Sequence, residues 1–246
     1  MGILFEEIDS QPSPLGEISL RRRRIPVLGD RDVYEVKLGD EFLMSSLFYE
    51  AEIALADLGL AALEASNAVE PQWDLVVGGL GLGYTAVAAL KNPGVRSMLV
   101  VDALDTVINW HKQELVPLGK QLNADPRCEY LHASFFDLAV PSGSGQGFDP
   151  AEPGRLFHAI LLDIDHSPRA LLNPGNGSFY TVESLSSMAR QLHDKGIFAL
   201  WSNDPPDDEF MSVLEKVFTF AEAQVVPFFN PFQNSQATNT IYIARK

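Results

Sequence analysis

One stretch decides the fold: Leu75-Val76-Val77-Gly78-Gly79-Leu80-Gly81-Leu82-Gly83-Tyr84-Thr85-Ala86. It opens with an unbroken apolar run, which is typical of a strand buried on both faces. Glycines follow the run, and a helical pattern at 85–91 follows the glycines. A strand, a glycine turn and a helix in this order let the backbone turn sharply and come close to a ligand. The stretch therefore predicts a buried strand with a ligand-binding loop at its end.

The rest of the chain repeats the alternation of buried strand and helix. Apolar runs without polar alternation recur at 97–101, 159–162 and 197–201, as expected of a parallel sheet covered by helices. Helical patterns lie at 46–63, 105–122, 178–194 and 207–221. Two final strands, 223–228 and 238–244, flank a turn-rich segment and suit an antiparallel hairpin. We predict an α/β fold with a mostly parallel sheet and a C-terminal antiparallel hairpin.

The N-terminal region has a different pattern. Short strand-like runs at 3–8, 16–21 and 32–38 are separated by turns that contain Pro or Gly. We therefore predict a small N-terminal β domain, 1–44, followed by an α/β domain, 45–246. A low-complexity segment rich in Gly, Ser and Pro, 141–154, is either a mobile insertion or a lid.

Composition narrows the possible partners. The 246 residues include 33 Asp and Glu but only 18 Lys and Arg, which gives a formal net charge of −15. This negative net charge disfavours binding to nucleic acid and favours binding of cationic substrates. The run Arg21-Arg22-Arg23-Arg24 is interpreted as an exposed strand end or an intersubunit contact. One cysteine, Cys128, rules out an intrachain disulfide, and no apolar window is long enough to span a membrane, so we expect a cytoplasmic protein.

Asp102 is the first candidate ligand-binding residue. It ends the strand after the glycine loop, 23 residues beyond Gly79. A carboxylate at this point can accept two hydrogen bonds from a ribose diol, as nucleoside and dinucleotide sites require. The alternative is a solvated loop acid beside a tight strand-to-helix turn. Gly81, Gly83 and Ala86 also fit the dinucleotide pattern, so the spacing leaves the nucleotide open.

Asp163, Asp165 and His166 form the second candidate cluster. They follow the buried run 159–162, and ligands of open α/β sheets bind at this carboxyl edge. The alternative is that they cap the turn that Pro168 enforces. No further ligands stand nearby, so we expect no metal. The chain lacks both the serine-hydrolase elbow and the phosphate-binding loop motif, which disfavours hydrolase and P-loop functions.

Together these motifs resemble the spermidine synthase family, polyamine aminopropyltransferases with a Rossmann-like class I methyltransferase fold. The resemblance extends from about Leu38 to the C-terminus and is carried by five segments: 77–83, 101–108, 125–127, 160–163 with Pro168, and 178–180. It implies transfer of an aminopropyl group from decarboxylated S-adenosylmethionine to a polyamine such as putrescine. It also implies S-adenosylmethionine or its decarboxylated form as a co-substrate, no permanently bound cofactor, a small cationic amine as partner and a homodimer.

The resemblance also implies roles for individual residues. The nucleoside-binding set is Gly79, Gly81, Gly83, Asp102, Ala103 and Ser134; the substrate-binding pair is Tyr180 and Phe229; the catalytic set is Asp163, Asp165 and His166. Several of these positions depart from the family pattern. Gly81 and Ser134 replace acids, His166 stands at the place of the second loop acid, and Phe229 replaces a tyrosine. The nucleoside half is therefore closer to the family than the amine half.

Aminopropyl transfer requires a base, because an amine with a pKa of ~10.4 costs about 4.6 kcal/mol to neutralise at pH 7. We expect Asp163 to take that proton, with Asp165 or His166 sharing the role. Both aspartates would repel the carboxylate of intact S-adenosylmethionine, which favours the decarboxylated donor. The alternatives are an S-adenosylmethionine-dependent small-molecule methyltransferase, a non-catalytic nucleoside-binding protein and a dehydrogenase.

Overall fold

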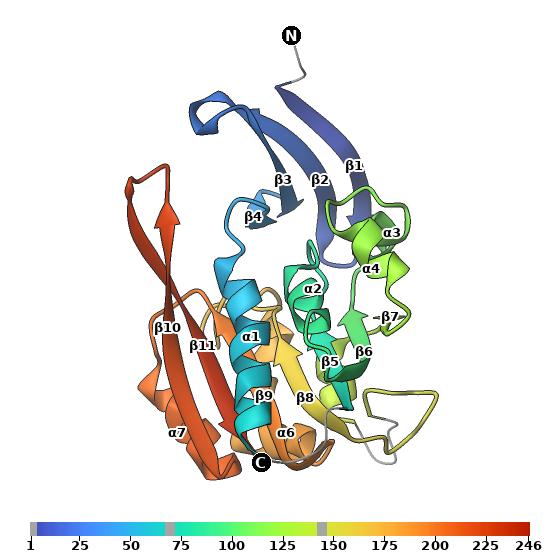
Figure 1. Ribbon diagram of the computed structural model, residues 1–246, viewed down its shortest axis with the longest axis vertical. Helices are drawn as coiled ribbons and strands as arrows, with labels where there is room; N and C mark the ends of the chain where they lie inside the picture. Colours follow the sequence, from blue (N-terminus) through green and yellow to red (C-terminus); the bar gives the residue numbers. More distant parts are fainter. Residues whose placement is uncertain (1–3, 67–71, 142–146) are drawn as a thin grey trace.

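The computed structural model describes residues 4–66, 72–141 and 147–246. Residue 3, where the first strand was predicted to begin, and 142–146 of the predicted insertion lie outside these ranges. The described chain forms two sheets, one with four strands and one with seven, together with helices (Figure 1).

The larger sheet confirms the predicted α/β fold. Its strand order is β10-β11-β9-β8-β5-β6-β7, and β9, β8, β5, β6 and β7 are mutually parallel. β11 runs antiparallel to β9 and pairs with β10 in the predicted hairpin. The strands are β5 (Trp73–Gly78), β6 (Val95–Asp102), β7 (Cys128–His132), β8 (Phe157–Leu162), β9 (Leu192–Ser202), β10 (Phe220–Asn230) and β11 (Ser235–Arg245).

Helices cover both faces of this sheet and create two cores. Val77 points into a core with α1 and α2, whereas its neighbour Val76 points into a second core with α5, α6 and α7. This alternation explains why the central strands are apolar throughout. The helices are α1 (Glu50–Ala65), α2 (Tyr84–Leu90), α3 (Asp105–Lys112), α4 (Gly119–Ala124), α5 (Phe135–Ala139), α6 (Val182–Ala189) and α7 (Asp208–Val217).

The smaller sheet lies over the carboxyl ends of the parallel strands (Figure 1). It is antiparallel, in the order β1 (Phe5–Ser13), β2 (Gly16–Ile25), β3 (Arg31–Leu38) and β4 (Glu41–Ser45). Ile18 and Val36 from this sheet join the core around α1 and α2. Asp9 accepts a 2.7 Å hydrogen bond from the indole N–H of Trp110 in α3. The two sheets are thus packed together, and this packing creates an edge at which a cleft can form.

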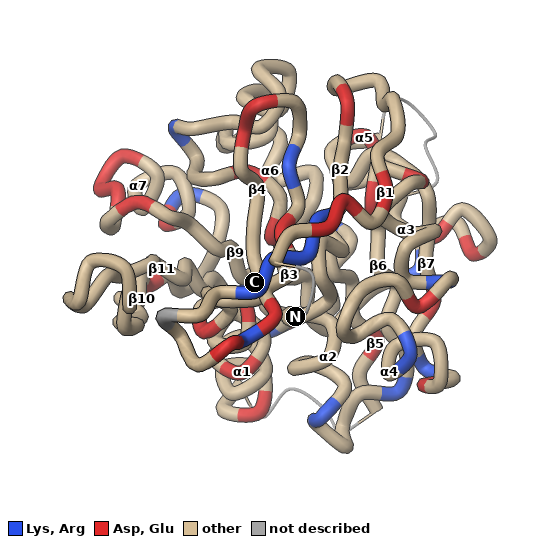
Figure 2. The backbone as a smooth tube through the Cα atoms, turned by 90° about the horizontal axis from the view of Figure 1, so that it is seen from above, with Lys and Arg blue, Asp and Glu red and all other residues tan. Residues whose placement is uncertain are grey.

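The four consecutive arginines in β2 pair with acids of the same sheet. Arg21 pairs with Glu7 at 3.1 Å, Arg22 with Glu6 at 2.5 Å and Arg24 with Asp32 at 2.8 Å, while Arg23 pairs with Glu35. Figure 2 looks down on this sheet and shows basic and acidic residues side by side. The run is therefore neutralised within the sheet and leaves no uncompensated basic patch there.

Three predicted helices are shorter than the sequence pattern indicated. The predicted helix 207–221 ends as α7 at Val217, because the chain enters β10 at Phe220. The predicted helix 105–122 breaks into α3 and α4, because Glu114 adopts a left-handed φ of 59° and Pro117 cannot continue a helix interior. The predicted helix 178–194 reduces to α6. A 3-10 turn, Pro174–Phe179, precedes α6, and Thr181 rather than Ser178 caps it by accepting from the N–H of Ser184. The chain after α6 joins the sheet as β9.

Within the ranges that the structure covers, none of the helices combines the length and apolar character needed to cross a lipid bilayer.

Candidate active-site cleft

A cleft of about 810 Å³ lies between the smaller sheet and the carboxyl edge of the larger one. This volume is in the range of small-molecule sites. The glycine loop and the ends of β6 and β8 form its floor, and α1 and the β10–β11 hairpin contribute one wall. The cleft is therefore at the place where open α/β sheets bind ligands.

The glycine loop approaches the end of β8 too closely for a side chain. Gly79 has a φ of 93°, and a Cβ atom there would lie 2.0 Å from the backbone oxygen of Asp163. At Gly81, with a φ of 46°, a Cβ atom would lie 2.5 Å from Cε of Met44. Met44 also accepts the N–H of Leu82 at its sulfur, 3.2 Å away. These glycines thus allow the loop to pass beside β8 and under β4.

His111 supports the loop from below. Its ring is fully buried, and Nε2 lies 2.9 Å from the carbonyl oxygen of Gly81. Burial lowers the pKa of His111 to about 4, so the ring is neutral at pH 7 and Nε2–H donates to this carbonyl. Gly83 packs against this ring at the start of α2, where a Cβ atom would lie 2.9 Å from Cε1 of His111.

Asp102 joins the loop to the end of β6. Its carboxylate accepts the N–H of Leu80 at 2.9 Å and that of Leu104 at 2.8 Å. Burial raises the pKa of Asp102, and these backbone hydrogen bonds oppose the rise. A carboxylate has about four acceptor positions, so two remain for a ligand diol. Asp102 also lines the cleft, which makes these positions accessible.

Asp163 lies just beyond the end of β8 and is half-buried on the cleft floor. Thr85, in the first turn of α2, donates a 2.8 Å hydrogen bond to one carboxylate oxygen. The backbone N–H of Asp163 donates to the carbonyl of Gly78, which fixes the start of the loop. Burial raises the pKa of Asp163 to about 6, against the effect of the Thr85 hydrogen bond. The group is therefore an ionisable acid with a pKa near neutral pH.

Glu52 faces Asp163 from the first turn of α1. Its side chain is only 8% exposed, yet it lines the cleft. Burial and the negative charge of Asp163 raise the pKa of Glu52 to about 8. Across the described parts of the chain, its carboxyl group makes no side-chain hydrogen bond or ion pair. The cleft thus holds two neighbouring carboxyl groups, the half-buried Asp163 and the buried Glu52, and Glu52 has no side-chain partner among the described residues.

The charged side chains that line the cleft are acidic. Among the described residues that line it, the carboxyl groups are Glu52, Asp102 and Asp163, and there is no Lys or Arg. The loop N–H groups of Gly79, Leu80, Leu82 and Gly83 are also occupied within the protein. An anionic ligand group would find neither a cationic side chain nor those loop donors. The site is therefore suited to neutral or cationic ligands.

The structure brings seven of the predicted residues together in the cleft. They are Gly79, Gly81, Asp102, Ala103, Ser134, Asp163 and His166. Ser134 also caps α5, because its hydroxyl accepts the N–H of Asp137 at 3.3 Å. His166 lies 3.9 Å from a carboxylate oxygen of Glu41 in β4, so it connects the loop after β8 with the smaller sheet.

Four predicted residues do not line the cleft: Gly83, Asp165, Tyr180 and Phe229. Asp165 is buried and accepts three hydrogen bonds, from the N–H of Leu172, the amide of Asn176 and the hydroxyl of Tyr180, all within 2.8 Å. These contacts occupy both Asp165 oxygens and the Tyr180 hydroxyl. The pair therefore holds the loop after β8 against the 3-10 turn instead of facing the cleft.

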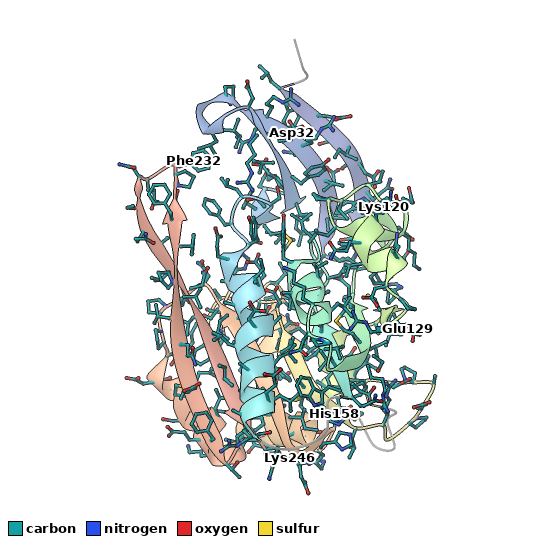
Figure 3. All side chains as sticks on the ribbon, viewed as in Figure 1. Asp32, Lys120, Glu129, His158, Phe232 and Lys246 are labelled. Atoms are coloured by element: carbon teal, nitrogen blue, oxygen red, sulfur yellow. The ribbon has the colours of Figure 1, made fainter. Side chains whose placement is uncertain are left out.

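Phe229 is on the outer face of β10. It is 51% exposed, whereas its neighbours Phe228 and Asn230 line the cleft. Because successive side chains on a strand point to opposite faces, a register error of one residue exchanges the two sets. Phe228 packs against Phe48 at 5.6 Å between ring centroids, and Phe232 lies 6.4 Å from the same ring. Figure 3 labels Phe232 at the tip of the hairpin, beside the smaller sheet.

Sequence reasoning missed Glu52, Met44, Thr85 and Trp201, all of which line the cleft or contact its acids. Only Glu52 carried a signal. It shares helical spacing with Leu55, Ala56, Gly59 and Leu63, the buried face of α1, so an acid there had to be buried too.

Figure 3 also shows His158 near the C-terminal Lys246, at the end of the molecule opposite the cleft.

No group of three or more His, Cys, Asp or Glu side chains in the described ranges is arranged to hold a metal ion.

Solved structures share this fold. Spermidine synthase from Thermotoga maritima superposes with a TM-score of 0.70 at 18% identity, over 98% of this chain and 72% of that one. A spermidine synthase in complex with the transition state analogue AdoDATO gives 0.68 at 17% identity, over 98% and 72%. Human methyltransferase-like protein 13 in complex with SAH gives 0.54 at 18% identity, over 79% and 81%.

No family model matches the sequence, and no curated protein matches it. At these identities the structural similarity shows the fold alone. The chain thus has the predicted class I methyltransferase fold, in the form that spermidine synthases share, with a smaller β sheet at the N-terminus and an antiparallel hairpin at the C-terminus.

Proposed function

We propose that this chain is an aminopropyltransferase, which moves an aminopropyl group from decarboxylated S-adenosylmethionine to an amine. The observation that carries the proposal is the charge of the cleft: carboxyl groups at Glu52, Asp102 and Asp163, with no Lys or Arg among its described lining residues. The donor and the acceptor are both cationic in this reaction. A cleft of this charge favours both.

The nucleoside half of the proposal rests on Asp102. Its two free acceptor positions suit the 2′ and 3′ hydroxyls of a ribose, and the adjoining Ala103 and Ser134 line the same part of the cleft. Phe135 and Phe136 also line it and offer apolar contact to a base. The similarity to a spermidine synthase that binds AdoDATO and to a methyltransferase that binds SAH supports an adenosine ligand here.

The choice of donor follows from the groups near Asp163. Intact S-adenosylmethionine carries a carboxylate, and Asp163, which is mostly ionised at pH 7 with its pKa of about 6, would oppose it. The N–H groups of Leu80 and Leu82, which could otherwise donate to that carboxylate, already donate to Asp102 and Met44. The decarboxylated form lacks that anion and ends in an ammonium group. It therefore fits the cleft better.

Transfer needs a base that collects one proton. In the proposed step, the acceptor nitrogen forms a bond to the carbon next to the sulfonium, and the carbon–sulfur bond breaks with its electrons passing to sulfur. The proton of the acceptor ammonium goes to Asp163, whose pKa of about 6 is close to neutral pH. Thr85 holds one oxygen of this carboxylate, so the other oxygen faces the amine.

The first prediction concerns Asp163→Asn. We expect it to lower product formation from decarboxylated S-adenosylmethionine and an amine by at least ~100-fold, because a positioned base contributes about that much. Nucleoside affinity should be unchanged, since Asn can still accept from Thr85. The measurements are mass-spectrometric detection of the aminopropylated amine and calorimetric titration with the donor. Asp208→Asn, on the exposed first turn of α7, is the matched control. Full turnover by Asp163→Asn would reject the assignment.

Methyl transfer is the second candidate, because a human methyltransferase-like protein shares the fold. Calorimetric titration with S-adenosylmethionine, its decarboxylated form and NAD separates the candidates. We expect the decarboxylated donor to bind tightest. Tighter binding of the intact donor, together with transfer of a labelled methyl group, would favour the methyltransferase. Tightest binding of NAD would favour a dehydrogenase, and nucleoside binding without any turnover would favour a non-catalytic protein.

A further inference from the structure

The part of the cleft around Asp163, where the proposed acceptor amine would bind, contains one pair of acidic side chains, Glu52 and Asp163. Glu52 comes from the first turn of α1 and Asp163 from the end of β8, and both line the same cleft. Asp102 is the third carboxyl group in the lining, but its backbone contacts place it at the glycine loop, on the ribose side. Glu52 and Asp163 therefore form the sole acidic position of the acceptor side, within the part of the chain that the structure covers.

The side chain of Glu52 is placed to contact a ligand in the cleft, because no protein side chain hydrogen-bonds to it in the described ranges. It is 92% buried, since its exposed fraction is 8%, and its carboxyl group has no side-chain partner in the described ranges. Because Glu52 lines the cleft, its carboxyl oxygens are open to a ligand there, and they make no side-chain hydrogen bond that the ligand would have to displace. An ammonium group placed between Glu52 and Asp163 would supply hydrogen bonds and positive charge to both.

The walls around this acidic position are apolar. Phe48 and Phe228 meet at 5.6 Å, and Trp201 adds a third aromatic ring to the lining. The smaller sheet contributes Ile18 and Val36. The polar groups beyond them are neutral amides: Asn239 donates to Asn203 at 3.1 Å, and both line the cleft. A second cationic group on the acceptor would thus meet no second acid.

We propose that Glu52 and Asp163 together bind the single ammonium group of an acceptor amine whose remaining body is uncharged and largely apolar. The proposal rests on the proposed aminopropyl transfer for its chemistry and narrows the acceptor class. It differs from the diamine putrescine that the family resemblance implies, because a diamine would leave its second ammonium group against Phe48, Phe228 and Trp201 without a counter-charge.

Two ligands of the same length test this. Pentylamine and 1,4-diaminobutane differ only in a terminal methyl group against a terminal ammonium group. We expect calorimetric titration of the full chain to show pentylamine binding at least 10-fold more tightly than the diamine. Equal or tighter binding of the diamine, or no binding of either amine, would overturn the proposal. This comparison uses the unmodified protein, so it does not depend on any variant folding.

Two substitutions in α1 test the role of Glu52. We expect Glu52→Gln to weaken pentylamine binding at least 10-fold, whereas Asp57→Asn, at an exposed position in the same helix, leaves it unchanged. Unchanged pentylamine binding by Glu52→Gln would also overturn the proposal. Titration with 5′-methylthioadenosine is run in parallel. If the unmodified protein does not bind 5′-methylthioadenosine, the proposed function is refuted. The comparison of the two amines is a separate measurement and does not depend on that result.

Discussion

Met44 occupies the space that a side chain at position 81 would need. Its Cε and Sδ atoms lie 2.5 and 2.6 Å from where a Cβ atom of residue 81 would stand, and its sulfur accepts the N–H of Leu82. The spermidine synthase resemblance implies an acid at this position, whereas here the thioether of Met44 from β4 fills the space. In the proposed acceptor site, the acid comes from α1 instead.

The proposed nucleoside binding depends on Asp102, and Asp102→Asn tests it. The amide NH₂ would face the N–H of either Leu80 or Leu104, and one acceptor for the ribose would be lost. We expect the affinity for 5′-methylthioadenosine to fall at least ~10-fold, since an unmade hydrogen bond costs about 1–3 kcal/mol. Calorimetric titration measures this. Asp105→Asn, exposed in α3, is the control. An unchanged affinity in Asp102→Asn would show that the ribose lies elsewhere.

At the scale of elements, the contact between the glycine loop and β8 would fix the distance between the proposed nucleoside ligand and the proposed base, Asp163. Gly79 lies against the backbone oxygen of Asp163, while the N–H of Asp163 donates to Gly78. The glycine loop and the end of β8, which carry the two halves of the proposed site, therefore cannot move independently. Positioning of this kind supplies much of the rate acceleration in transfer between bound substrates.

Gly79→Ala should break this contact. The new Cβ atom would lie 2.0 Å from the oxygen of Asp163, and the φ of 93° is strained for alanine. We expect the free energy of unfolding to fall by roughly 3 kcal/mol or more, from strain and overpacking together. Denaturant unfolding measures it. Gly154→Ala is the matched control, because Gly154 has a φ of 86° with no atom within 4 Å. Equal losses in the two variants would mean that strain alone matters and that the contact does not.

The elements that the sequence predicted are those set by local pattern. The buried strands 75–77, 97–101 and 159–162 and the glycine turn were all predictable, because apolar runs and glycines act over a few residues. Asp102 and Asp163 followed from their places at strand ends. Met44 could not be predicted, since its contact with Leu82 joins residues 38 positions apart. Phe229 was misplaced because the facing of β10 depends on its pairing with β11 and not on its own sequence.

At the scale of the whole molecule, the acidic pair links stability to pH. The folded pKa of Glu52, about 8, and that of Asp163, about 6, are both above their usual values of 4.5 and 3.8. The folded state therefore holds these protons more tightly than the unfolded state does. The two raised pKa values contribute to the free energy of unfolding. This contribution is fully present at a pH below the pKa values of the unfolded state, and it is lost as the pH rises through the pKa values of the folded state. The negative charge of Glu50 adds to the effects of burial and of Asp163 on the pKa of Glu52.

Glu52→Gln should remove most of this dependence. Denaturant unfolding near pH 5 and near pH 8 should show the variant gaining stability over the unmodified protein as the pH rises, by up to about 1.4 kcal/mol per pH unit for one proton. Asp57→Asn should keep the original slope, because Asp57 is exposed in the same helix and does not act on the pKa of Glu52. A pH dependence that is the same in Glu52→Gln and in the unmodified protein would show that the carboxyl group ionises normally.

The absence of Lys and Arg from the described lining of the cleft also disfavours binding of adenosine compounds that carry phosphate groups. ATP and similar metabolites carry the same sugar and base, followed by a phosphate chain with several negative charges. That chain would meet Asp163 and Glu52 without a counter-ion, in a molecule whose overall charge of −15 already repels it. The protein could therefore select a scarce sulfonium nucleoside in the presence of abundant nucleotides without any contact dedicated to rejecting them.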